Sequence, residues 1–101
     1  MDPLTALAEP RRREILHLVW SRERTAGDIA RRLPVTFGAV SQHLRVLREA
    51  GLVDVRRGGR QRIYRARKES MGPLREYLEQ LWTGRLVILK RLAEAEQSAN
   101  V

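Results

Sequence analysis

Residues 35–53, VTFGAVSQHLRVLREAGLV, constrain the fold more than any other stretch, because they predict a helix that leads directly into a strand. Thr36 is a suitable N-cap residue for this helix, and Gly51 is a common C-terminal stop. At about 3.6 residues per turn, three apolar residues share one face and are expected in the core: Val40, Leu44 and Leu47. The opposite face is polar and carries Gly38, Ser41, Gln42, Arg45 and Glu49.

A shorter helix is expected just before this one, over the stretch TAGDIARRL. Thr25 and Asp28 have the spacing of a capping box, and the helix must stop before Pro34. Its apolar residues are expected to face inward: Ile29, Ala30 and Leu33. Two short helices joined by a tight turn, the second with a polar outer face, form a helix-turn-helix.

A β-hairpin is predicted immediately after the polar-faced helix. Leu52–Arg57 and Arg60–Ala66 are rich in branched, aromatic and charged residues, and they flank Gly58-Gly59, a two-residue turn signal. Further helices are predicted at both ends of the chain, over about residues 3–8, from Pro10, and from Pro73 to about Gln97. We therefore expect one domain over residues 1–101, mainly α with a β-hairpin: a winged helix-turn-helix of four helices, a two-stranded wing and a long C-terminal helix.

Positive charge is concentrated around the predicted hairpin. The chain carries a formal net charge of +8. Residues 51–70 hold seven basic and two acidic side chains, a net of +5, whereas residues 71–101 hold four of each. A charge run is usually a solvated face, but an excess of one sign on so short a segment favours a polyanionic partner, and double-stranded DNA is the partner we expect.

The polar helix face and the hairpin supply the predicted DNA contacts. Gln42 suits an adenine edge, Arg45 suits guanine or a phosphate, and Ser41 can donate to either. Phe37 and the Thr36 methyl group suit a thymine methyl, and Gly38 would let the backbone approach DNA closely. The hairpin arginines are expected on phosphates, which position a protein without reading sequence: Arg56, Arg57, Arg60 and Arg62. Ordinary surface polarity is the alternative for each of these residues.

Other classes of site have little support in the sequence. The chain has no cysteine and two histidines, so we expect no disulfide, no metal site and no cofactor, and we interpret His43 as a packing residue. No acid–base pair, activated serine or phosphate-binding glycine loop is evident, so we do not expect an enzyme. No apolar run reaches membrane-spanning length and no signal segment opens the chain, which predicts a cytoplasmic, nucleoid-associated protein without a membrane partner.

Four stretches together resemble the ArsR family of winged-helix bacterial repressors: ALAEPRRREIL, TAGDIARRL, VSQHLRVLREAGLV and RRGGRQRIYR. The resemblance implies a homodimeric repressor that binds an imperfect palindrome, often in its own promoter, with residues 36–45 as recognition helix and 52–66 as wing. Metal-sensing members carry cysteines where this chain has TAGDIARRL, so the chain resembles a metal-independent branch, and its inducer is unknown. Phe37-Gly38 replaces the Gln-Pro or Ser-Pro pair of many relatives, which leaves the recognised DNA sequence open.

The terminal helices, about residues 3–8 and 73–97, are expected to form the dimer interface. The last helix carries a long apolar stripe, and a chain this small gains by burying such a stripe against a partner. The family resemblance pairs this helix and the first one across a two-fold axis. The expected interface residues are Leu4, Leu7, Leu74, Leu78, Leu81, Trp82, Arg85, Leu89 and Leu92. A monomer whose last helix folds back on its own core is the alternative.

The sequence is compatible with two other functions. A nucleoid-type architectural protein would coat DNA without sequence preference and would need the same basic wing. A winged helix that mainly recruits another protein would use the apolar last helix, although the +5 segment argues against that as its sole role.

Overall fold

The computed structural model describes residues 1–84. The sequence predicts one domain over residues 1–101, whereas the contacts within the chain group into two compact units, one of Met1–Ser70 and a second that begins at Met71. The first unit contains four α-helices, a three-residue 3-10 helix (Lys68–Ser70) and a small sheet, and the described part of the second contains one α-helix. Everything that positions the predicted DNA contacts lies in the first unit.

The chain opens with two helices, α1 (Pro3–Ala6) and α2 (Pro10–Leu18). Each begins with a proline directly after an acidic N-cap residue, because a proline at the first helical position loses no hydrogen bond. Arg12 and Arg13 at the start of α2 donate to backbone carbonyls at the end of α1, including those of Ala6 and Leu7. These arginines therefore satisfy carbonyl groups that α1 leaves free.

The predicted helix-turn-helix is confirmed as α3 (Ala26–Arg32) and α4 (Phe37–Glu49). The Thr25 hydroxyl accepts from the Asp28 amide at 3.1 Å, and the Thr36 hydroxyl accepts from the Ala39 amide at 3.1 Å. Both predicted N-caps are therefore present. The second half of the capping box is not, because the Asp28 carboxylate accepts hydrogen bonds from arginines instead.

The hairpin is part of a three-stranded antiparallel sheet of order β1-β3-β2. Its strands are β1 (Arg24–Thr25), β2 (Val53–Gly58) and β3 (Gln61–Ala66). The sequence predicts two strands, and β1 is an addition to that expectation. The predicted turn is also wrong by one residue: Gly58 pairs with Gln61, so the turn residues are Gly59 and Arg60. Gly59 has φ +66° and Arg60 does not have a positive φ, which is the pattern of a type II′ turn.

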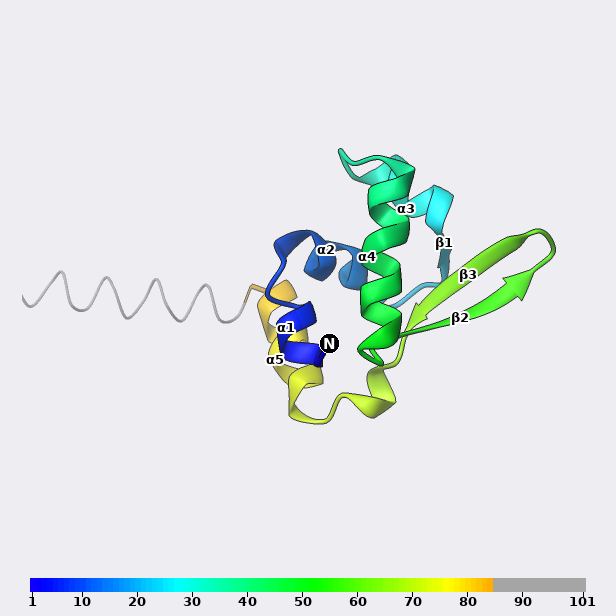
Figure 1. Cartoon of the computed structure of the whole chain (residues 1–101). Helices are drawn as coiled ribbons and strands as arrows, with labels where there is room; N and C mark the ends of the chain where they lie inside the picture. The colour runs from blue at the N-terminus through cyan, green and yellow to red at the C-terminus, as the bar shows by residue number, and fades with distance from the viewer. Residues whose placement is uncertain (85–101) are drawn as a thin grey trace, which may run out of the picture. The chain divides into compact units, whose positions relative to one another are not determined.

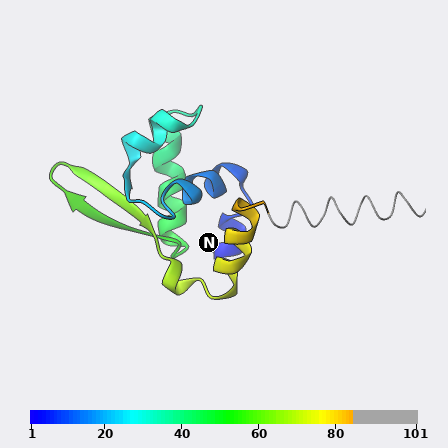
Figure 2. The same cartoon turned by 180° about the vertical axis from the view of Figure 1, so that it is seen from behind.

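The core of the first unit lies beneath α4, which packs against α2, α3 and the start of β2. The three predicted core residues of α4 have no exposed surface: Val40, Leu44 and Leu47. Ile15 and Leu16 of α2 and Ile29 of α3 are buried with them. The hairpin β2–β3 projects beyond α4, with β1 lying beside its base (Figure 1), and the view from behind shows the same arrangement (Figure 2). Burial of one face thus fixes α4 and leaves its other face free.

The described part of the second unit is α5 (Pro73–Trp82). The sequence predicts one uninterrupted helix from Pro73 to about Gln97, but α5 ends at Trp82, and Gly84 has φ +79°. A positive φ is incompatible with a continuing right-handed helix. Residues 85–101, including Arg85, Leu89 and Leu92 of the predicted dimer interface, lie outside the described part.

Candidate nucleic-acid interface

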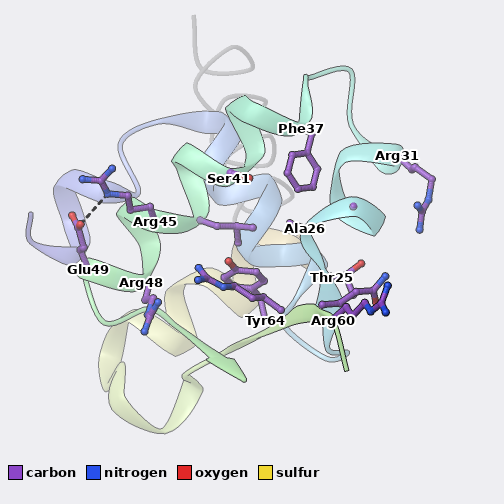
Figure 3. Close-up of a pocket in the computed structure, with 14 residues that line it drawn as sticks. Thr25, Ala26, Arg31, Phe37, Ser41, Arg45, Arg48, Glu49, Arg60 and Tyr64 are labelled. Atoms are coloured by element: carbon purple, nitrogen blue, oxygen red, sulfur yellow. Dashed lines mark hydrogen bonds and ion pairs between the residues drawn. The ribbon is translucent and has the colours of Figure 1, made fainter. Parts of the chain in front are cut away.

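A hollow of about 910 Å³ lies between α4, the start of α3 and the hairpin strand β3. Figure 3 shows Tyr64 at its floor, with Phe37 and Ser41 on the α4 side. Five arginines surround it, drawn from α3, α4 and the wing: Arg31, Arg45, Arg48, Arg60 and Arg62. Of the residues that line the hollow, Glu49 is the one carboxylate. The hollow is therefore strongly electropositive and opens to solvent on the face that the sequence assigns to DNA.

The exposed face of α4 divides into a wall of this hollow and a strip beside it. Successive residues of a helix turn by about 100°, which places Phe37, Ser41 and Arg48 on one line along the helix. These three line the hollow, together with Arg45. Gly38 and Gln42 are exposed and lie further round the helix. The predicted base-reading residues thus form one continuous surface along α4, from its first turn to Arg45.

Two of the α4 residues already have partners within the chain. The Thr36 hydroxyl caps the helix, so its methyl group is what remains for a base contact. Arg45 Nε donates to Glu49 Oε1 at 3.3 Å, one helical turn further on. Ser41 and Gln42 have no hydrogen-bond partner among residues 1–84, so their donors and acceptors are free for a ligand.

Strand alternation places the wing arginines on two faces of the hairpin, and cross-strand partners point to the same face. Arg57 lies directly opposite Arg62, and both side chains point to the same face of the hairpin as the buried Tyr64. No carboxylate in the described chain lies within ion-pair distance of Arg57, Arg62 or Arg60. Like charges placed directly opposite each other on two strands are unfavourable for the sheet. The inner face of the wing therefore holds unneutralised charge at a cost to folding.

The outer face of the wing is neutralised instead. Arg56 Nε donates to Glu23 Oε2 at 2.7 Å. Asp54 lies 3.0 Å from Arg65 Nη2 and 3.3 Å from Arg67 Nε. The sequence predicts that Arg56 contacts DNA with the other wing arginines, but the structure pairs it with Glu23 on the opposite face of the hairpin.

Asp28 organises the arginines beside the hollow. Its carboxylate lies 2.9 Å from Arg24 Nη1, 3.0 Å from Arg32 Nε and 3.6 Å from Arg31 Nη2. The hydrogen bonds from Arg24 and then Arg32 hold the pKa of Asp28 below its ordinary value. One carboxylate therefore holds together three guanidinium groups, of which Arg31 borders the hollow.

Arg31, Arg48 and Glu49 are the site residues that sequence reasoning did not select as DNA contacts. Arg48 lies seven positions after Ser41 and shares its helix face, so helical periodicity could have found it. Arg31 borders the hollow only because α3 lies beside β3, which is a tertiary relation. Glu49 is visible as the i+4 neighbour of Arg45.

The family model for bacterial regulatory proteins of the arsR family matches residues 9–55, from the start of α2 to the first half of β2. The HTH-type transcriptional regulator Rv2034 of Mycobacterium tuberculosis is 38% identical over 91 residues, which span 90% of this chain and 85% of that protein. The chain belongs to the arsR family. It is thus a bacterial transcriptional regulator with a DNA-binding winged helix-turn-helix, and the family is not one of enzymes.

Two solved structures extend the comparison of this arsR-family chain to its fold. A crystal structure of a possible transcriptional regulator for arsenical resistance is 42% identical with a TM-score of 0.69, covering 87% of this chain and 95% of that one. A homodimeric winged helix-turn-helix DNA-binding domain from Mycobacterium bovis is 32% identical with a TM-score of 0.70, covering 81% of this chain and 76% of that one. The predicted winged helix-turn-helix fold is confirmed.

Among residues 1–84, the other predicted residues of this arsR-family regulator do not line the hollow. His43 is half-buried, with Nδ1 3.5 Å from Arg12 Nη1, as expected of a packing residue. Leu4 is 71% exposed on α1, whereas Leu7 is buried. Of the predicted interface residues on α5, Leu78 is buried within the single chain, whereas Leu74, Leu81 and Trp82 are half-buried. Among residues 1–84, no helix is long and apolar enough to span a membrane, and no three histidine, cysteine or acidic residues are grouped as metal ligands would be.

Proposed function

We propose that this chain is a homodimeric, sequence-specific repressor that binds an imperfect palindrome, including one in its own promoter. The observation that carries the proposal is the hollow, where an exposed helix face with free hydrogen-bonding groups meets a wing whose inner arginines have no partner among the described residues. Double-stranded DNA would use both surfaces, because its base edges can pair with the helix face and its phosphates with the wing arginines.

In the proposed recognition step, the α4 side of the hollow contacts bases and the wing side contacts phosphates. The N-terminal half of α4 enters the major groove, where Gln42 and Ser41 meet base edges and Arg45 meets a guanine or a phosphate. Arg57, Arg60 and Arg62 of the wing meet phosphates, and Arg31 and Arg48 add further contacts to the backbone beside them. Arg56 is not among these contacts, because Glu23 already neutralises it on the outer face.

The palindrome requires two copies of α4 related by a two-fold axis. The homodimeric winged helix-turn-helix from Mycobacterium bovis supports this arrangement. Leu4, exposed on α1, and the half-buried apolar residues of α5 are the proposed contacts between protomers: Leu74, Leu81 and Trp82. Two-fold symmetry would set the recognition helices about 34 Å apart, or about one turn of DNA.

Repression requires fewer binding surfaces than activation does, because a dimer bound across a promoter excludes RNA polymerase by occupying the site. Activation would require an additional surface for the polymerase. The proposed contacts with DNA and with a second copy already account for the α4 face, the inner wing and Leu4.

Selection of bound duplexes from a random DNA pool tests the proposal. We expect an enriched palindrome whose half-site centres are about 10–10.5 base pairs apart. Transcription from a promoter that carries the selected site should fall when the protein is expressed. A pool that retains no consensus while binding tightly would instead support a non-specific architectural protein.

A further inference from the structure

We propose that Glu49 is a specificity-determining residue that holds Arg45 away from DNA lacking the correct base. The inference rests on the proposed function, since it concerns how the same helix face rejects other sequences. Glu49 would act through Arg45: its carboxylate occupies the guanidinium in the free protein, and only a base edge that binds the guanidinium strongly displaces it.

The position of Glu49 is unfavourable both for the helix and for general attraction to DNA. It is the last residue of α4, where the negative end of the helix dipole favours a cation. It is also the one carboxylate among the lining residues of a hollow that carries five arginines. A glutamate at this point weakens both the helix and the attraction to a polyanion, so neither folding nor bulk affinity explains it.

The Arg45–Glu49 pair contributes little to stability. The two side chains are 72% and 58% exposed, and the Nε–Oε1 distance is 3.3 Å. Exposed pairs of this kind contribute little to folding, and arginine placed before glutamate is the less favourable order along a helix. The geometry instead places the carboxylate where it directs one guanidinium along the helix surface, as the dashed contact in Figure 3 shows.

This arrangement discriminates between DNA sequences for a simple reason. A phosphate that accepts from Arg45 must displace the Glu49 carboxylate and, being anionic, is also repelled by it, whereas a guanine edge carries no net charge. A guanine edge accepts two hydrogen bonds from one arginine, which a carboxylate bound through Nε alone does not match. Glu49 thus removes the contact of Arg45 from non-specific binding and leaves it in specific binding.

The expected effect of Glu49→Gln follows from counterion release. Freeing Arg45 adds about one phosphate contact on non-specific DNA, which steepens the slope of log K against log salt by about 0.9. We take the added contact to contribute nothing at about 1 M salt. With this slope, the affinity of Glu49→Gln for a shuffled duplex at about 0.15 M salt is then about fivefold higher than that of the wild type. Affinity for the selected operator changes less, so the ratio between the two falls.

The test uses fluorescence anisotropy of the full chain with the selected operator and a shuffled duplex across a salt series. Glu14→Gln is the matched control, because Glu14 pairs with Arg11 at 2.9 Å on the surface of α2 and does not line the hollow. We expect Glu49→Gln to tighten shuffled binding about fivefold and Glu14→Gln to leave it unchanged. In an Arg45→Gln background, the effect of Glu49→Gln should disappear.

Three results would overturn the inference. Unchanged binding of the shuffled duplex would show that Glu49 does not restrain Arg45. An equal gain in the Arg45→Gln background would assign the effect to general repulsion instead. A loss of operator binding in Glu49→Gln would mean that Glu49 itself reads a base amino group. A wild-type protein that does not prefer the operator would refute the proposed function, which is a separate outcome.

Discussion

Arg57 and Arg56 are neighbours in sequence, and the structure predicts opposite consequences for their removal. Arg57 faces Arg62 across the hairpin without a carboxylate partner among the described residues, whereas Arg56 is 2.7 Å from Glu23 on the other face. Arg57→Gln should therefore weaken DNA binding while stabilising the free protein. Arg56→Gln should leave DNA binding almost unchanged while destabilising the free protein slightly.

The magnitudes follow from charge and register. Removing one phosphate contact reduces the salt slope by about 0.9 and lowers affinity about fivefold at about 0.15 M salt. Relieving a directly opposed pair of like charges on two strands is worth about 0.2–1 kcal/mol. Breaking an exposed ion pair costs about the same amount, with the opposite sign. For a domain of this size, about 0.5 kcal/mol corresponds to a shift of about 2–4 °C in Tm.

Two assays on the same preparations measure these effects. Anisotropy with a fixed duplex across a salt series gives the slope for wild type, Arg57→Gln and Arg56→Gln, and thermal unfolding gives Tm. We expect a shallower slope with a higher Tm for Arg57→Gln, and an unchanged slope with a lower Tm for Arg56→Gln. Equal losses of slope in the two variants would refute the division of the wing into a DNA-facing and a neutralised face.

Three further predictions concern the turn, the arginine cluster and the dimer. Gly59→Ala should lower stability by about 1–2 kcal/mol, measured by urea unfolding, because Gly59 has φ +66° and an alanine is strained there; an unchanged midpoint would contradict this backbone assignment. Asp28→Asn should destabilise the protein near neutral pH, since the carboxylate accepts from Arg24 and Arg32. The pKa of Asp28 is lowered in the fold, so the stabilisation by its carboxylate is complete above about pH 5 and is lost as pH falls through the folded pKa. The wild type and Asp28→Asn should therefore converge in stability only at a pH below that lowered pKa. Leu4→Glu should shift sedimentation toward the 11.7 kDa monomer, because Leu4 is 71% exposed on the proposed interface; a dimer of unchanged strength would place the interface elsewhere.

The local patterns of the sequence predict the helices of the site because each signal lies within a few residues of its effect. Thr36 caps α4 through the amide three residues later, and Val40, Leu44 and Leu47 are buried as helical periodicity requires. Features that depend on distant parts of the chain were not predictable in this way. The strand β1 has two residues, and it exists because Arg24 and Thr25 pair with β3, about 40 positions further along.

The wing shows both what the sequence determines and what it leaves open. Either pair of residues around Gly58-Gly59 suits a tight turn, and the register that places Val55 opposite Tyr64 decides between them. Once that register is known, strand alternation separates Arg57 from Arg56 without further information. The partner of Arg56 is Glu23, which only the folded chain brings to it.

The central claim is that the exposed face of α4 reads bases while the inner wing holds phosphates. Fluorescence anisotropy of the wild-type chain with the upstream sequence of its own gene and a shuffled duplex, across a salt series, tests it most directly. A preference of about 10³ or more that persists as salt rises is the predicted result. Equal binding to both duplexes, falling together with salt, would contradict it.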